Sequence, residues 1–248
     1  LDEEEEILIK EMLKWQISYV EDAIWIDSSE VRRLDARLTD KIRGAVVEPH
    51  SAQVDGYRLN LSLAEVLERK CVNIKLRKVT GIRHKNKRVT GVEYEGGVIE
   101  CHQVVLAMGA WAAASQQWLD FPIPVRPLKG ERILLDFDAP PLSAFLTSPK
   151  RGHIISLADG HWSIGSTGGR DFDQVGSFLG DEFDMTATEE AKIELLERAL
   201  YVLPALEHAQ ISQQMAGSRP ASPDRMPIIG PVPGWDGVYL ALGHTTSG

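Results

Sequence analysis

Apolar residues in the first seventy positions recur every three or four residues, which is the spacing of helices. The opening segment follows it at Leu8, Met12, Trp15 and Tyr19, and the acidic run 2–6 complements the positive end of a helix. Asp27 and Glu30 form a capping-box pair that predicts a second, short helix. The run 45–47 predicts a strand. Asp55 can then cap a third helix, with an inner face of Leu59, Leu63, Val66 and Leu67.

From Val72 onward the apolar period changes from 3.6 residues to two. Alternation over 72–76 predicts one strand. Residues 79–82, 89–94 and 98–101 predict a β-hairpin or a three-stranded meander, with a turn at 95–97. The basic stretch 83–88 is interpreted as the solvated turn of this hairpin rather than as a binding patch.

Two uninterrupted apolar runs end in glycine, 104–108 before Gly109 and 238–242 before Gly243. Runs without alternation are typical of strands buried on both faces, so both are expected in one central sheet. In open α/β sheets, ligands bind beyond the carboxyl ends of such strands. We therefore expect a ligand near Gly109 and near the loop 243–248, whose two glycines and three hydroxyl side chains suit hydrogen bonding to a flat polar ring.

The chain changes character from Phe121 onward, where prolines at 122, 124 and 127 mark a crossover. Alternating strands are predicted at 133–137, 153–157 and 161–166, the last two joined as a hairpin. After a loop at 168–184, a helix is predicted with a Thr186…Glu189 capping pair and an end at Pro204. Its inward residues would be Ile193, Leu196, Leu200 and Leu203.

Together these elements predict an α/β protein built from two interleaved lobes. Antiparallel sheet and helices over 1–41 and 121–216 would form an α+β lobe. The other lobe, over 42–120 and 217–248, would contain the two strands that end in glycine.

Composition narrows the class of function. The 248 residues carry a formal charge of −9 without a Lys/Arg stripe, which argues against nucleic-acid binding. No apolar run long enough for a membrane span and no signal peptide is present, and the isolated Cys71 and Cys101 fit a reducing cytoplasm. A zinc or serine hydrolase is disfavoured, because the seven histidines lack ligand spacing and G-x-S-x-G is absent.

Arg219 is the candidate binding residue. It lies between Ser218 and Pro220, and proline sterics should hold it extended and limit how its guanidinium is presented. An arginine held in this way can grip a small carboxylate through two parallel hydrogen bonds. On the local sequence alone, an Arg-Pro step is more often a surface turn.

The segment SRPASPDRMPIIGPV (218–232), followed by GVYLALGH, resembles the C-terminal signature of the D-amino-acid oxidase/glycine oxidase (DAO) family of flavoenzymes. Earlier in the chain, the segments VVLAMGAW, PVRPLKGE and IGST occur in the order found in the family, so the resemblance covers nearly all of the chain. It implies an incomplete, Rossmann-like FAD-binding lobe interleaved with a substrate lobe. It also implies oxidation of the C–N bond of an amino acid, such as a D-amino acid or glycine, or of a related small amine, by hydride transfer to FAD.

The resemblance assigns roles to individual residues. Arg219 would hold the substrate carboxylate, and His153 and Thr246 would line the substrate pocket. Main-chain N–H groups of 244–248 would stabilise charge on the reduced flavin. No catalytic acid or base and no metal ligand is assigned, and each nearby histidine could equally be structural. The cofactor-binding residues would be Val79, Ala107, Gly109, Ala110, Trp111, Gly217, Gly243, His244, Thr245, Thr246, Ser247 and Gly248.

Three features depart from the family pattern. No G-x-G-x-x-G opens the chain, and the family continues past Gly248, so we expect an inactive fragment that does not retain FAD. His153 stands in place of a tyrosine and Thr246 in place of a second arginine, which leaves the substrate open. The electron acceptor and a homo-oligomeric state are also open.

The alternative is a non-catalytic module on the same fold that binds a small acid or a partner protein. Colour separates the two hypotheses. A yellow full-length protein that bleaches under amino acids indicates the enzyme, and a colourless protein that binds ligand indicates the module.

Overall fold

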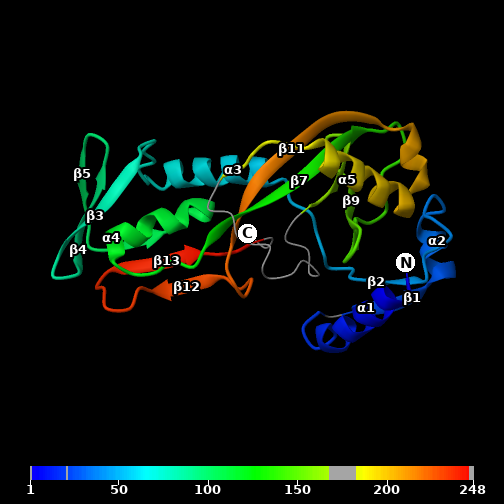
Figure 1. Cartoon of the computed structure of the whole chain (residues 1–248), viewed down its shortest axis with the longest axis horizontal. Helices are drawn as coiled ribbons and strands as arrows, with labels where there is room; N and C mark the ends of the chain where they lie inside the picture. Colours follow the sequence, from blue (N-terminus) through cyan, green and yellow to red (C-terminus); the bar gives the residue numbers. More distant parts are fainter. Residues whose placement is uncertain (1, 21, 168–182, 246–248) are drawn as a thin grey trace.

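Two long antiparallel strands, β7 (Arg126–Asp136) and β11 (Gln210–Ala221), run along the middle of the molecule and connect its two ends (Figure 1). The computed structural model describes residues 2–20, 22–167 and 183–245. Pro127 lies directly opposite Pro220 in the β7/β11 ladder. A proline has no N–H group to donate to the facing strand. Because the two prolines face each other, neither strand loses an acceptor for an N–H group, and the ladder continues past both.

At one end, β7 and β11 belong to a five-stranded antiparallel sheet of order β11-β7-β10-β9-β8. The other strands are β8 (Leu146–Ser148), β9 (Gly152–Ser156) and β10 (His161–Gly165). Helix α5 (Glu189–Val202) and the short η3 (Pro204–His208) pack on one face of this sheet. The side chains between them are at most 2% exposed at Ile133, Leu135, Ile164, Leu195 and Leu203.

The N-terminal elements pack against the same core. They are α1 (Glu3–Gln16), β1 (Ile24–Asp27), α2 (Ser28–Leu34) and β2 (Gly44–Val47), and β1 pairs with β2. Ile26 and Val31 belong to the buried cluster. Glu5 is 1% exposed, and its carboxylate accepts hydrogen bonds from Ser148 Oγ at 2.6 Å and Asp2 N at 3.3 Å. The bond from Ser148 fixes α1 to β8, and the bond from Asp2 N closes the capping box of α1.

A second core lies at the other end of the molecule. Its sheet has the order β12-β13-β6, from β6 (Val104–Leu106), β12 (Ile228–Pro231) and β13 (Val238–Leu242). β6 runs parallel to β13 and continues into η1 (Gly109–Ser115) and α4 (Gln116–Leu119). A meander of β3 (Val79–Lys85), β4 (Arg88–Tyr94) and β5 (Gly97–Glu100) joins this core through Ile82 and Val89.

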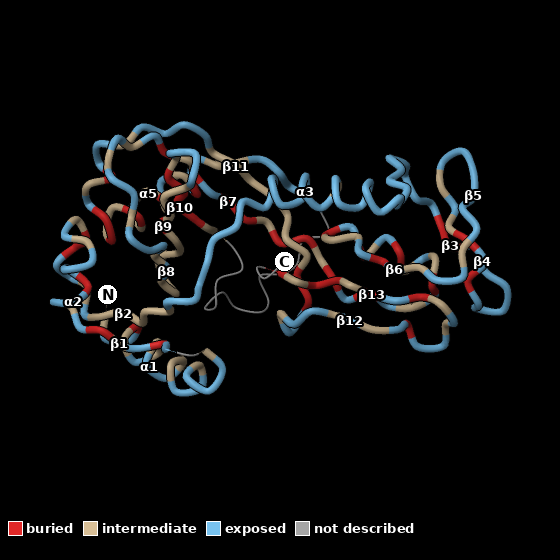
Figure 2. The backbone as a smooth tube through the Cα atoms, turned by 180° about the vertical axis from the view of Figure 1, so that it is seen from behind, coloured by how far each residue is buried: buried red, intermediate tan, exposed pale blue. Residues whose placement is uncertain are grey.

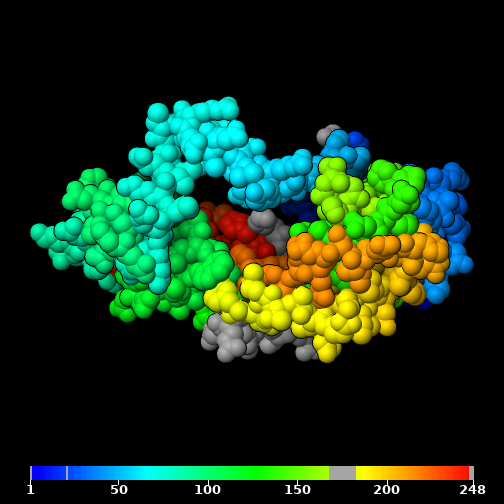
Figure 3. Space-filling model, turned by 90° about the horizontal axis from the view of Figure 1, so that it is seen from above, coloured from blue at the N-terminus to red at the C-terminus, as the bar shows by residue number. Residues whose placement is uncertain are grey.

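Helix α3 (Gly56–Arg69) is amphipathic but packs on nothing in the described chain. It begins after Asp55, whose side chain accepts a hydrogen bond from Arg58 N at 3.0 Å, as predicted. Its apolar face is 40–51% exposed at Leu59, Leu63, Val66 and Leu67. Figure 2 shows the helix exposed along its length, and Figure 3 shows it standing off the body across an open hollow. The expectation that this face points inward is therefore wrong for these residues.

Several expected strands and faces also need correction. Segment 72–76 forms no strand, and its apolar side chains are 46–89% exposed, because no neighbouring strand supplies hydrogen-bond partners. β6 and β13 are buried on one face only, since Val105 is 62% and Tyr239 37% exposed. β8, most of β11, and β12 were not predicted.

The helix over 189–202 also differs from its prediction in register. Its buried residues are Ala191, Leu195, Ala199 and Val202, whereas Ile193 is 50% exposed. Thr188, and not Thr186, caps it by accepting a hydrogen bond from Ala191 N at 3.3 Å. Leu196 and Leu200 pack at the margin of the core.

The other elements are confirmed in type, including the Asp27 capping box, β2, the meander and the β9–β10 hairpin. The apolar stripe expected for α1 is wrong at its end, because the helix stops at Gln16 and Trp15 and Tyr19 are 56% and 82% exposed. The mixed α/β fold with antiparallel sheet is also confirmed. The buried side chains fall into two main clusters, and the division into a substrate lobe and a cofactor lobe stays a prediction. No helix in 2–20, 22–167 or 183–245 is both long and apolar enough to cross a bilayer.

Candidate functional site

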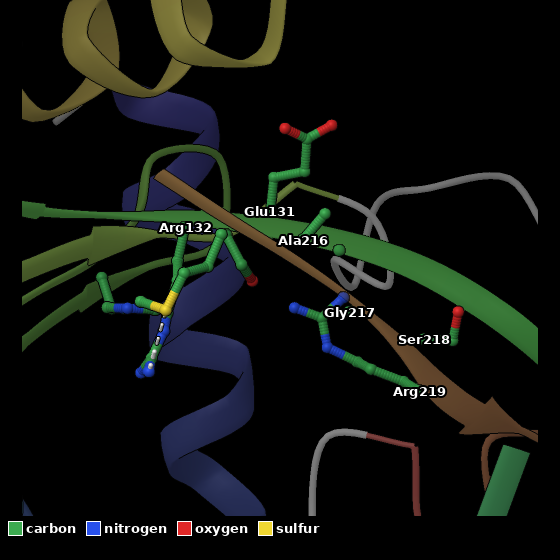
Figure 4. A pocket seen from close by; sticks show the side chains of 10 residues that line it. Glu131, Arg132, Ala216, Gly217, Ser218 and Arg219 are labelled. Carbon is green, nitrogen blue, oxygen red and sulfur yellow. Dashed lines mark hydrogen bonds between the residues drawn. The ribbon is translucent and has the colours of Figure 1, made fainter. Parts of the chain in front are cut away.

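An open cavity of about 350 Å³ lies where β7 and β11 pass β9 and β10 (Figure 4). Arg219 and His153, which the sequence singled out, both line it. The full lining is Gly130, Glu131, Arg132, His153, Ser166, Met215, Ala216, Gly217, Ser218 and Arg219.

Strand register brings the side chains of Arg132, His153 and Met215 to one face of the sheet. Met215 lies opposite Arg132, Arg132 opposite Gly165, and Gly165 opposite His153. Directly opposed residues in antiparallel strands share a face, so these residues form one row across four strands. Two residues farther along, Gly217 lies opposite Gly130 and makes the neighbouring row.

Glycines on the floor of the cavity have no side chain, which leaves space for Arg219 and His153 to lie against the backbone. A Cβ at Gly130 would overlap the guanidinium of Arg219, which therefore lies against the Gly130 backbone. A Cβ at Gly165 would lie 2.8 Å from His153 Cε1, so the imidazole covers that glycine. A Cβ at Gly217 would meet nothing within 4 Å. Gly130 is thus a requirement for this arginine position, whereas Gly217 borders open space.

The extended backbone expected for Arg219 is confirmed, since β11 runs through it to Ala221. Arg219 Nη1 donates a hydrogen bond to Thr167 O at 3.2 Å. Thr167 in turn is fixed to β7, because its N donates to Glu131 O at 3.1 Å and its Oγ1 accepts from Glu131 N at 2.9 Å. The guanidinium is therefore held partly buried in the cavity, with β7 and Thr167 as its supports.

The Glu131 carboxylate points away from Arg219, toward α5 (Figure 4). It is 4% exposed and accepts hydrogen bonds from Thr188 N at 2.8 Å, Thr188 Oγ1 at 3.0 Å and Gln214 Nε2 at 3.1 Å. Lys129 Nζ lies 3.4 Å from it. This acid anchors the start of α5 and does not neutralise the cavity arginines.

His153 carries no charge at neutral pH. Burial, and secondarily the positive charges of Arg132 and Arg219, lower its pKa to about 4. Its Nε2 lies 3.4 Å from Ser163 Oγ. The cavity thus presents two guanidinium groups beside a neutral imidazole.

The loops after β6 and β13 leave the same edge of one sheet. The two strands are parallel, so their carboxyl ends lie at the same edge of the sheet. Thr245 N donates a hydrogen bond to Pro220 O at 2.9 Å, and His244 forms an isolated antiparallel β-bridge with Ala221. The loop after Gly243 is therefore tied to β11 one residue beyond Arg219. This bond engages the Thr245 N–H, which was expected to face a flavin.

The loop after β6 offers an open edge. Gly109 has φ +55°, and a Cβ there would meet nothing within 4 Å, so a flat group can approach its backbone. Ala107 and Trp111 are exposed, and Trp111 stacks on Phe183 with 4.9 Å between ring centroids. Ala110 is 3% exposed, so its methyl group belongs to the core. Ala107 and Gly109 therefore leave an edge open to one part of a flat cofactor, whereas the Ala110 side chain is not available to it.

Other expected site residues lie elsewhere. Val79 is in the meander, 42% exposed, and outside the cavity lining. Gly217 lies on the cavity floor rather than beside Gly109. Thr246, Ser247 and Gly248 lie outside the described residues. Within the described ranges, no cluster of three or more His, Cys, Asp or Glu could hold a metal ion.

The sequence reasoning missed Gly130, Arg132, Ser166 and Met215. Had the predicted strand been extended back past Ile133, its alternation would have placed Gly130 and Arg132 on one face, together with Leu128. Met215 could be found only through the β7/β11 register.

Comparison with known proteins gives concordant results. A family model described as "FAD dependent oxidoreductase" (DAO) matches residues 2–248. The glycine oxidase of Pseudomonas putida is 36% identical over 179 residues, which cover 71% of this chain and 46% of that protein. The hydrogen cyanide synthase subunit HcnC of Pseudomonas protegens is 31% identical over 250 residues, covering 99% of this chain and 57% of that protein.

Solved structures agree with these matches. Glycine oxidase from Bacillus cereus superposes with a TM-score of 0.85 at 28% identity, covering 98% of this chain and 66% of that one. Glycine oxidase from Geobacillus kaustophilus gives 0.87 at 25% identity, covering 100% and 64%. The chain spans about half the length of the curated relatives it matches.

Proposed function

We propose, from the premise that this chain belongs to the DAO family of FAD-dependent oxidoreductases, that the protein oxidises the C–N bond of a small amino acid or amine. The observation that carries the proposal is the position of Arg219, whose guanidinium lies over Gly130 in an open cavity. A guanidinium held in one place can bind a carboxylate through two parallel hydrogen bonds. Binding there would fix the α-carbon of the substrate relative to the cavity floor.

FAD, when bound, supplies the acceptor for the electron pair that leaves the C–N bond. On this chain, the backbone at Gly109 and the loop from Gly243 to Thr245 would contact it, because both lie at the shared edge of β6 and β13. These 248 residues contain no G-x-G-x-x-G segment for the pyrophosphate. We therefore expect this stretch alone to bind FAD poorly.

The charges in the cavity favour the neutral form of a substrate amine. Arg132 and Arg219 place positive charge near the site, and nearby positive charge lowers the pKa of an ammonium group. His153 stays neutral above about pH 5, so it adds no further cation. Oxidation needs the nitrogen lone pair, so this field supports the reaction while Arg219 holds the carboxylate.

The names of similar proteins fit this substrate class. Relatives at 30% identity or more include glycine oxidases and a D-amino acid dehydrogenase from Xanthobacter autotrophicus. A cavity of about 350 Å³ suits a substrate of amino-acid size.

The test is the colour of the full-length protein. We expect it to purify yellow and to bleach anaerobically when amino acids or N-methyl amino acids are added. A colourless protein that binds small acids without redox chemistry would favour the alternative, a binding module. An isolated 248-residue chain with a flavin absorbance band would contradict the expected loss of FAD.

A further inference from the structure

Arg132 is a second guanidinium on the cavity, and the proposed reaction assigns no group of a simple amino acid to bind it. It projects from β7 between Met215 and Gly165. A Cβ at Gly165 would lie 3.1 Å from Arg132 Cβ, so a side chain there would crowd the arginine. Its polar contact within the described chain is Met215 Sδ, 3.9 Å from Nη2.

The surroundings leave its charge without a carboxylate in the described chain. Glu131, its neighbour in sequence, points to the opposite face and is engaged by Thr188 and Gln214. Other arginines pair with acids, as Arg37 does with Asp35 and Arg88 with Asp236. In a chain of net charge −9, a cavity arginine with no acid beside it is a good anion site.

The two guanidinium groups serve the same space. Arg219 lies over Gly130, and Arg132 is two residues farther along the same strand, roughly 7 Å away at the backbone. Gly130 and Gly217 form a floor between them, with open space above Gly217. The positive charges of both arginines also help to lower the pKa of His153, so both act on the same part of the cavity.

We infer that the cavity takes an amine with two acidic groups, a short amino- or imino-dicarboxylate, with one carboxylate on Arg219 and the other on Arg132. The inference rests on the proposed function and adds the substrate class. Each charged hydrogen-bonded contact contributes roughly 1.5–3 kcal/mol, so a second carboxylate strengthens binding roughly 10- to 100-fold. Because Arg132 is exposed, this gain falls as salt is raised.

The experiment compares acetate and succinate, as mono- and dicarboxylate probes, by calorimetric titration into the full-length, FAD-loaded protein. We expect succinate to bind the wild type roughly 10- to 100-fold more tightly than acetate. In Arg132→Gln the ratio of the two dissociation constants falls toward one, and in Arg132→Lys part of it is kept. Arg83→Gln, an exposed change of equal charge on β3, keeps the wild-type ratio.

Two results would overturn the inference. Equal dissociation constants in the wild type would remove the second anion site, and a preference that survives in Arg132→Gln would place that site elsewhere. Failure of the proposed function looks different, because the protein would then lack flavin, or acetate binding would be unaffected by Arg219→Gln. If neither acid binds at all, both proposals fail.

Discussion

Helices α3 and α5 have the same length, and α3 has the more sharply segregated apolar face, but only α5 is buried. Leu195 in α5 is 2% exposed because the sheet of β7, β9 and β10 lies beneath it. Leu63 in α3 is 51% exposed, and nothing in the described chain covers it. The difference shows that an apolar stripe specifies a helix, whereas burial depends on the surface that meets it.

A similar contrast between supported and open structure separates the surroundings of Arg219 from those of Gly109. Around Arg219 the guanidinium has described supports, because Gly130 lies beneath it and Thr167, which is hydrogen-bonded to β7, accepts its hydrogen bond. Around Gly109 the backbone is open and Trp111 is 60% exposed. On the proposed function, the chain therefore carries a supported arginine for a carboxylate next to an edge that would supply only part of a cofactor site.

The largest expected effect tests the helix comparison. Leu195→Ala should lower the free energy of unfolding by about 2–5 kcal/mol, because it leaves a cavity in the core. Leu63→Ala, the same substitution on α3, should change it by less than about 0.5 kcal/mol. Urea denaturation of this chain measures both. A comparable loss in both variants would mean that the α3 face is covered in solution.

The next effect separates the two facing glycines. In the full-length protein, Gly130→Ala should weaken acetate binding roughly 10- to 100-fold, because its methyl group displaces the Arg219 guanidinium. Gly217→Ala, directly opposite on β11, should change the dissociation constant by less than about threefold. Calorimetric titration with unchanged thermal stability is the measurement. Equal losses in the two variants would refute the role of Gly130.

The smallest effect concerns pH. The folded-state pKa of His153, about 4, lies below the ordinary value near 6.5, so the unfolded chain binds the extra proton first as pH falls. Stability from this group is full above about pH 6.5 and is lost as pH falls toward 4. The loss is about 1 kcal/mol, since the ring is only partly buried.

His153→Gln supplies the control for this effect. Carboxylates such as Glu6, whose pKa is lowered to about 2 by hydrogen bonds from Lys10 and Arg43, add their own loss at lower pH in both proteins. The difference in melting temperature between wild type and variant should therefore change between pH 7 and 4. A constant difference across that range would contradict the lowered pKa.

The sequence predicted local structure best where the signal is itself local. Asp27 and Asp55 cap helices as expected, and the meander folds around its predicted turns, because these features depend on adjacent residues. Pro220 held Arg219 extended for the same reason. Segment 72–76 failed because alternation describes a strand but cannot supply its partner.

The floor of the cavity could not be read from the sequence. Gly130, Gly165 and Gly217 are far apart along the chain, and only the register of β7, β10 and β11 places them side by side. The prolines before Leu128 suggested a crossover, although Pro127 pairs with Pro220 inside the strand. Arg132 was missed because the strand was predicted to start at Ile133, directly after it, whereas β7 starts at Arg126.

The most direct test of the account is the affinity of full-length, FAD-loaded protein for acetate, compared between wild type and Arg219→Ala. A charged, hydrogen-bonded contact of roughly 1.5–3 kcal/mol predicts a dissociation constant at least about tenfold higher in the variant. Arg83→Gln should leave it unchanged. An Arg219→Ala protein that binds acetate as tightly as the wild type would contradict the claim that this guanidinium is the carboxylate site.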